Sequence, residues 1–98
     1  MIHLIATLHI REGTLDEVLS LARPCIEATR REDGCLLYDL HQSLTEPTKL
    51  AFVEKWRDRT ALERHFNEPH LIAWRDAGAP FITAKSIEII SGGDVETL

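Results

Sequence analysis

Four stretches in which apolar residues alternate with other residues limit most strongly how this chain can fold. An alternation with a period of two predicts a strand that turns one face toward the core. Between these strands, two stretches repeat their apolar residues at helical spacing, so the order is β-α-β-β-α-β. That order predicts an α+β, ferredoxin-like fold, in which a four-stranded antiparallel sheet carries helices on one face. The predicted strands cover residues 2–10, 35–43, 49–56 and 82–90.

The first helical pattern covers residues 14–32. Thr14 and Glu17 have the spacing of a capping box, in which each side chain satisfies a free backbone group at the start of a helix. Gly34 can adopt the left-handed conformation that ends a helix. The short link between the second and third strands then favours an antiparallel hairpin.

The second helical pattern is interrupted. Asp58 can cap a short helix that contains His65. Pro69 suits the first turn of another helix, which ends near Gly78. Residues 91–98 are polar, and we expect them to form a tail that is loose unless it docks on a partner.

Composition limits the partners of the chain. Its 98 residues, 1–98, form one predicted domain, and 44% of them are apolar, as in ordinary globular chains. A domain this short leaves about 35–40% of its unfolded surface exposed, so a second copy against the sheet would add stability and a homodimer is predicted. A net charge of -5 with scattered basic residues disfavours nucleic acid. Because no apolar run could span a membrane and no basic signal segment begins the chain, we expect a cytoplasmic protein without a membrane partner.

Motifs that hold cofactors are missing from the sequence. The chain has no glycine-rich dinucleotide fingerprint, no P-loop and no CxxC pair. His65 and His70 lie on either side of the predicted helix break, which is not the spacing that places two metal ligands on one helix face. We therefore expect no cofactor and no metal. His70 lies in the first turn of a helix, where a neutral ring with a structural capping role is expected.

His65 is the strongest candidate for chemistry. It borders the apolar stripe of its helix and is expected to face partly inward. A histidine pKa of about 6.5 makes this side chain a proton acceptor near neutral pH. The alternative is a histidine that holds a loop by one hydrogen bond. Tyr38 could supply its hydroxyl from the sheet to a ligand oxygen, or it could simply span core and surface.

Other residues could shape a pocket around that histidine. Glu54 has apolar neighbours on its strand face, so burial would raise its pKa and make it a possible base. The more common arrangement pairs a buried acid, here with a nearby turn or with Arg57 or Arg59. Trp74 could wall a pocket or fill the core. Ala6 is a small residue on a core face, which leaves room for a ligand.

Three short motifs carry a resemblance to a known family. They are Glu-Asp-Gly-Cys at 32–35, Glu-Lys-Trp at 54–56 and Ala-Leu-x-x-His-x-x-x-x-His at 61–70. Together they resemble the antibiotic biosynthesis monooxygenase (ABM) domain family, including its quinol monooxygenases, over nearly the whole chain. The resemblance implies a dimeric α/β barrel in which two sheets pair, with a pocket between each sheet and its own helices.

The resemblance also implies an activity. It indicates a cofactor-independent monooxygenase that uses molecular oxygen on a small aromatic, phenolic or quinol-type substrate. In such a reaction His65 would be the catalytic base or oxyanion partner, and Tyr38 would be a catalytic hydrogen-bond donor. The residues expected to bind the substrate are Ala6, Phe52, Glu54 and Trp74.

The same family leaves other activities open. An isomerase of a small phosphorylated, sugar-like signalling molecule would need cations for the phosphate, for which the sequence offers Arg57, Arg64 and Arg75. A non-catalytic dimer that binds a small molecule is a further alternative. Heme degradation fits poorly, because the positions that align with the asparagine, tryptophan and iron-binding histidine of that branch hold Ala6, His65 and Arg75.

Overall fold

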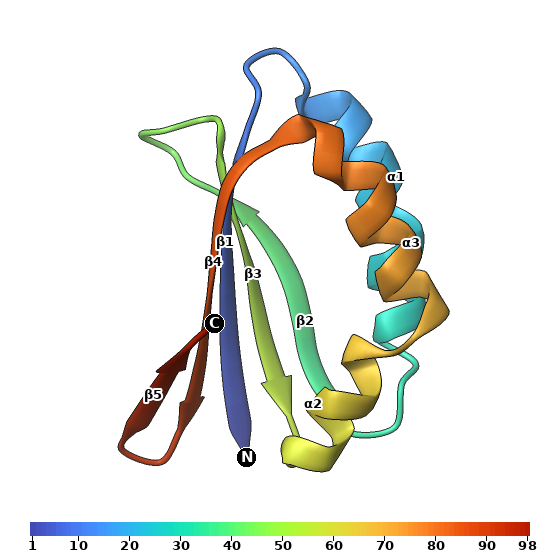
Figure 1. The fold of residues 1–98 in the computed structure, drawn as a ribbon, viewed down its shortest axis with the longest axis vertical. Coiled ribbons are helices and arrows are strands. Elements are labelled where there is room, and N and C mark those ends of the chain that lie inside the picture. Colours follow the sequence, from blue (N-terminus) through green and yellow to red (C-terminus); the bar gives the residue numbers. More distant parts are fainter.

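The computed structural model describes residues 1–98 as an antiparallel sheet with helices packed on one face (Figure 1). Neighbouring strands follow the order β2-β3-β1-β4-β5. The elements are β1 (Ile2–Ile10), α1 (Leu15–Thr29), β2 (Cys35–Gln42), β3 (Lys49–Trp56), α2 (Arg59–Phe66), α3 (Pro69–Gly78), a 3₁₀ turn (Ala79–Phe81), β4 (Ile82–Ser91) and β5 (Asp94–Thr97). The predicted α+β, ferredoxin-like arrangement is confirmed.

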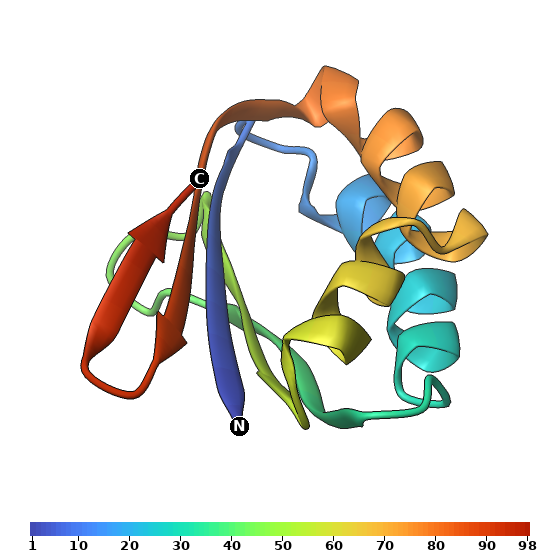
Figure 2. The same cartoon turned by 60° about the horizontal axis from the view of Figure 1, so that its bottom comes forward.

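The core lies between the sheet and the helices. Residues of β1 are alternately buried and half-buried, and the buried set faces the helices. Trp56, Leu62 and Val18 are fully buried there and come from β3, α2 and α1. Figure 2 shows that the three helices lie on the same side of the sheet and leave its other face without a helix. No helix in the chain has the length and apolar character needed to cross a membrane.

The sheet has a fifth strand that the sequence analysis did not predict. Within the expected tail, Asp94–Thr97 form β5, which pairs with β4 so that Ser91 lies opposite Asp94. Gly92, at φ +60°, turns the chain between the two strands. Every residue of β5 is exposed, but Glu96 reaches Arg59 of α2 at 2.8 Å. The end of the chain is therefore a hairpin in place of the predicted loose tail.

The helix starts differ in how well the sequence predicted them. The Asp58 carboxylate accepts a hydrogen bond from the Ala61 backbone N–H at 2.8 Å, so the predicted cap of α2 is confirmed. The predicted capping box of α1 is wrong, because the Thr14 hydroxyl donates to the Arg11 carbonyl oxygen at 2.6 Å and caps no helix N–H. α1 also ends at Thr29, before the predicted limit at residue 32.

Candidate active site

A cavity of about 160 Å³ lies between the sheet and helices α2 and α3. Of the 14 residues that line it, 10 are hydrophobic, so a ligand there would contact mainly apolar side chains. All six residues that the sequence analysis proposed for the site line this cavity. They are Ala6, Tyr38, Phe52, Glu54, His65 and Trp74.

Ala6 helps to keep this space open. It is paired with Phe52 of β3 on one side and with Ile87 of β4 on the other. A methyl group between two large side chains on one sheet face leaves a hollow that a longer side chain would fill. Phe52 in turn packs against Trp74 of α3, with ring centroids 6.0 Å apart.

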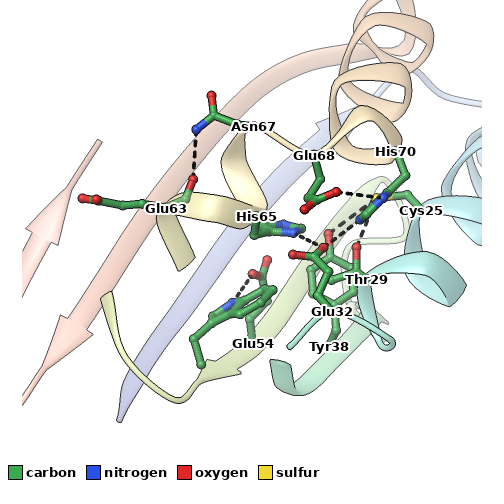
Figure 3. A network of polar contacts seen from close by, with 11 residues as sticks. Cys25, Thr29, Glu32, Tyr38, Glu54, Glu63, His65, Asn67, Glu68 and His70 are labelled. Carbon is green, nitrogen blue, oxygen red and sulfur yellow. Dashed lines mark hydrogen bonds and ion pairs between the residues drawn. The ribbon is translucent and has the colours of Figure 1, made fainter. Parts of the chain in front are cut away.

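The break between α2 and α3 brings His65 and His70 to one carboxylate. α2 ends at Phe66 and Pro69 begins α3, so the two histidines lie on different helix axes. His65 Nδ1 and His70 Nε2 each lie 2.7 Å from Oε2 of Glu32 (Figure 3). The spacing rule for a single helix does not apply across such a break, which is why the sequence did not predict that the two rings converge.

Glu32 is the central residue that the sequence analysis missed as a functional side chain. It follows the end of α1, and its side chain is only 9% exposed. Its position is fixed by a tight turn, in which the Glu32 N–H donates to the Thr29 carbonyl and the Cys35 N–H donates to the Glu32 carbonyl. Only the family motif at 32–35 marked this residue, because nothing in the local sequence shows that it meets a ring 33 positions away.

The carboxylate of Glu32 sets which nitrogen of His65 is free. An ionised carboxylate only accepts hydrogen bonds, so Nδ1 of His65 must carry its proton and donate. Nε2 then keeps a lone pair. No fully buried side-chain nitrogen or oxygen in the structure lacks a partner, so Nε2, which has none, keeps some accessible surface. His65 is one of the residues that line the cavity.

Burial keeps His65 neutral. The side chain is 2% exposed and packs against Trp56, with ring centroids 4.7 Å apart. Burial lowers the pKa of His65 below its ordinary value of 6.5, and the hydrogen bond to Glu32 opposes that shift only in part. A neutral imidazole with a free nitrogen toward an apolar cavity is equipped to accept a proton.

The same cluster has the donor types of a metal site. The ligand atoms of Glu32, His65 and His70 lie within 4.8 Å of one another, and two imidazoles with one carboxylate suit a divalent transition metal. Glu68 lies behind His70, 4.0 Å from its Nδ1. A metal ion here would have to replace the hydrogen bonds that Nδ1 of His65 and Nε2 of His70 make to Glu32. The expectation that the protein binds no metal stays a prediction.

Glu54 is buried, but its partner is not the one expected. Its Oε1 accepts a hydrogen bond from Trp56 Nε1 at 2.9 Å, whereas Arg57 pairs with Asp33 and Arg59 with Glu96. Glu54 is thus paired, as expected of a buried acid, but the expected partner, a nearby turn or an arginine, is wrong. Burial is the largest cause that raises the pKa of Glu54, the hydrogen bond from Trp56 opposes it and the nearby Glu32 adds to it, so the pKa rises to about 7.

Replacing Glu54 by glutamine is expected to stabilise the fold at alkaline pH. A folded-state pKa of about 7, raised from 4.5, means that protonated Glu54 contributes stability below pH 4.5 and that this contribution is lost as pH rises through 7. Glutamine keeps the acceptor for Trp56 and cannot ionise, so the gain above pH 7 is at most about 3 kcal/mol. Urea unfolding of Glu54→Gln and wild type across this range measures it, with exposed Glu88→Gln as the control. Equal stabilities at all pH values would show that Glu54 ionises normally.

Tyr38 lies beside His65, but its hydroxyl points toward α1. The two ring centroids are 5.5 Å apart, and the hydroxyl lies 3.9 Å from Sγ of Cys25. Burial raises the pKa of Tyr38 strongly, so the phenol stays protonated at all physiological pH values. The ring of Tyr38 forms part of the cavity wall, and a role for its hydroxyl as a donor to the substrate stays a prediction.

The sequence profile of the antibiotic biosynthesis monooxygenase family, ABM, matches residues 1–77 of this chain. Among curated proteins, the uncharacterized protein sll1783 of Synechocystis is 32% identical over 80 residues, which are 82% of this chain and 54% of that protein. This chain thus spans about half the length of that relative. The Mycobacterium tuberculosis protein named "Putative monooxygenase Rv0793" is 35% identical over 71 residues, covering 72% of this chain and 69% of the other.

Solved structures agree with the sequence comparison. The structure of Rv0793 superposes with a TM-score of 0.86 at 29% identity and covers 95% of both chains. The structure of PA3566 from Pseudomonas aeruginosa superposes with a TM-score of 0.85 at 30% identity, over 95% of this chain and 94% of the other. Because the profile match covers most of the chain and its relatives share the fold, this chain belongs to the antibiotic biosynthesis monooxygenase (ABM) family.

Proposed function

We propose that the protein is a cofactor-independent monooxygenase that acts on a small phenolic or quinol-type aromatic compound. The observation that supports this most is a neutral, buried His65 whose Nδ1 is held by Glu32 while its Nε2 is left for an apolar cavity. Membership of the ABM family and the names of its relatives favour a monooxygenase. The substrate and the independence from cofactors are part of the proposal.

The size of the cavity favours a single aromatic ring. An engineered apolar cavity of about 150 Å³ in another protein binds benzene, and the cavity here measures about 160 Å³. Phe52 and Trp74, tilted 65° to each other, would contact the faces and edges of such a ring. A phenol or hydroquinone in the cavity beside these two rings would have its hydroxyl within the reach of His65, which lines the same cavity.

The proposed reaction needs no external reductant. His65 accepts the hydroxyl proton, and the electron-rich phenolate passes an electron to oxygen in a site that excludes water. For a hydroquinone, one oxygen atom enters the ring and the other leaves as water, so that quinol and oxygen give hydroxyquinone and water. The substrate supplies all four electrons that reduce oxygen. The protein contributes the base, the dry cavity and the orientation of the ring.

Glu32 acts in this proposal as a positioning residue, and its replacement by glutamine is expected to lower kcat about tenfold or more. Glutamine is uncharged, so it accepts weaker hydrogen bonds from the two imidazole rings than the carboxylate does. The tautomer and orientation of His65 are then less well fixed. Because the Glu32 charge raises the pKa of His65, its loss is also expected to move the acidic limb of the kcat/KM profile to lower pH. Steady-state rates across pH measure both effects, with exposed Glu27→Gln as the control. A lower kcat with an unmoved limb would mean that Glu32 acts only on the fold.

The isomerase alternative has weaker support. Of its three candidate cations, Arg57 and Arg64 both lie near Asp33, at 2.9 Å and 3.9 Å, and neither lines the cavity. Arg75 alone lines it. A non-catalytic binding role would differ from the proposal in one observable, because the ligand would bind without any consumption of oxygen.

The proposal includes a second copy of the chain against the free face of the sheet. Ile5 and Val53 are paired and half-buried, and they alternate with the buried residues that face the helices. That other face of the sheet carries no helix (Figure 2). Burying these side chains against the same face of another protomer would cover the sheet on both sides. Light scattering in solution measures the resulting mass.

Oxygen uptake by purified protein tests the proposed function. The protein is treated with a chelator and shown by absorbance to be free of flavin, and it is then mixed with a panel of single-ring hydroquinones. We expect one oxygen molecule consumed for each hydroxyquinone formed. No uptake above the spontaneous rate with the whole panel, or uptake that returns only with added metal or flavin, would contradict the proposal.

A further inference from the structure

Two basic side chains lie at the end of the cavity opposite Glu54. Lys85 of β4 pairs with Leu8 of β1, whereas Glu54 of β3 pairs with Leu4. These two positions on β1 are four residues apart, about 13 Å along a strand. Arg75 of α3 lines the same cavity as Lys85. The cavity therefore has acid and base groups at one end and two cations at the other.

Arg75 and Lys85 lie where the cavity opens. Both side chains also line an adjoining surface hollow together with Ala79 and Thr83, and both residues are exposed. A group bound between them would thus be partly hydrated, while a ring attached to it would extend inward past Trp74. That geometry suits a ligand with an aromatic inner part and a charged outer part.

Neither cation has an acidic partner. Four other arginines do have one, among them Arg30 with Asp39 at 3.0 Å, Arg57 with Asp33 at 2.9 Å and Arg59 with Glu96 at 2.8 Å. The remaining basic residues without an ion pair, such as Arg23 and Lys49, do not line this cavity. The chain has 16 acidic residues against 11 basic ones, yet no carboxylate comes within ion-pair distance of Arg75 or Lys85. Two unpaired cations at the mouth of an apolar cavity are placed to attract and hold an anion.

We propose that the substrate is a phenol that also carries a carboxylate, and that Arg75 and Lys85 bind this carboxylate at the cavity mouth. The anion fixes the outer end of the substrate, so the hydroxyl at the inner end is presented to Nε2 of His65. A guanidinium and an ammonium at the mouth then select among phenols that the apolar walls alone would not distinguish. This proposal names the substrate class of the oxygenase proposed above and rests on it.

Binding measured without oxygen tests this proposal separately from turnover. Calorimetry compares p-hydroxyphenylpropionate with its neutral amide, which has the same ring and chain. We expect wild type to bind the carboxylate about three- to tenfold more tightly than the amide, a preference of the size that partly exposed ion pairs provide. The preference is expected to shrink at high salt. Oxygen uptake with neutral hydroquinones, described above, can succeed or fail independently of this result.

Variants identify the groups responsible. The double variant Arg75→Gln/Lys85→Gln is expected to bind both ligands equally and to keep the affinity of wild type for the amide. The control Arg23→Gln/Lys49→Gln removes two cations outside the cavity that also lack an ion pair, and it is expected to keep the preference. Equal binding of the two ligands by wild type, or no binding of either, would overturn the proposal. A preference that survives in the Arg75/Lys85 variant would overturn it as well.

A third ligand separates a carboxylate from a phosphate ester. p-Hydroxybenzylphosphonate has the same phenol with a phosphate-like anion. We expect it to bind no more tightly than the carboxylate. Much tighter binding that depends on the same two cations would identify a phosphorylated ligand in place of the carboxylate and would favour the isomerase reading of the site.

Discussion

Replacing His65 by alanine is expected to lower kcat for quinol oxidation by about 10²–10⁴-fold, the range typical of a removed general base. The reason is that Nε2 is the nitrogen of His65 that Glu32 does not engage, and His65 lines the cavity. Glu54 also lines the cavity, but Oε1 accepts from Trp56 and its pKa of about 7 leaves it partly protonated near neutral pH. An oxygen electrode measures the rate at several quinol concentrations, which separates kcat from KM.

The controls distinguish lost chemistry from lost structure. His41 is exposed near the end of β2 and does not line the cavity, so His41→Ala is expected to keep full activity. Circular dichroism and urea unfolding check that His65→Ala is folded at the assay temperature. A folded His65→Ala protein with unchanged turnover would remove His65 from the mechanism.

Replacing Gly34 by alanine is expected to destabilise the protein by about 2–5 kcal/mol. Gly34 has φ +91°, and a Cβ added there would lie 2.5 Å from the Cβ of Ala61 in α2. The left-handed conformation costs a side chain about 1–2 kcal/mol, and forcing the buried Ala61 to move costs about 1–3 kcal/mol more. This turn also separates Glu32 from β2, so a shift there would disturb the contact with His65. The midpoint of urea unfolding measures the loss.

A second glycine with positive φ separates the backbone cost of the substitution from the cost of the contact with Ala61. Gly13 has φ +79°, and a Cβ there would meet nothing within 4 Å, so Gly13→Ala is expected to cost only the backbone part. Adding Ala61→Gly to Gly34→Ala is expected to recover the contact part, seen as a favourable coupling energy in a double-mutant cycle. If Gly34→Ala lowers the free energy of unfolding no more than Gly13→Ala does, close packing between Gly34 and Ala61 does not contribute to stability.

The patterns of neighbouring residues predicted the helices and strands well, because each of these elements depends mainly on residues close together in the sequence. The alternation along β1 matches the observed alternation of burial residue by residue, and Pro69 marks where the second helix resumes. The two glycines before Asp94 favour the hairpin that ends the chain, whereas the polar composition of residues 91–98 alone predicts a loose tail. The capping box failed because the Thr14 hydroxyl found a carbonyl of the preceding turn, and residue spacing cannot show which partner a hydroxyl takes.

The site was predictable only in part. The four strand residues proposed for the site line the cavity because the alternation of the strands fixes which residues face inward, and helical spacing does the same for His65 and Trp74. The role of Glu32 depends on how α1, α2 and α3 meet, and the position of Lys85 depends on its register with Leu8. Such contacts between distant segments are set by tertiary packing. They have no signature in residue spacing.

The ionisation of a bound, unreactive phenol tests most directly whether His65 takes a phenolic proton in this cavity. p-Nitrophenol is electron-poor, resists oxidation and has a pKa near neutrality, and its anion absorbs visible light while the neutral form does not. The lowered pKa of His65 makes proton transfer partial, so at a pH below the pKa of the free phenol a larger fraction of the bound ligand is expected as nitrophenolate in wild type than in His65→Ala. An equal or smaller fraction in wild type would contradict the account.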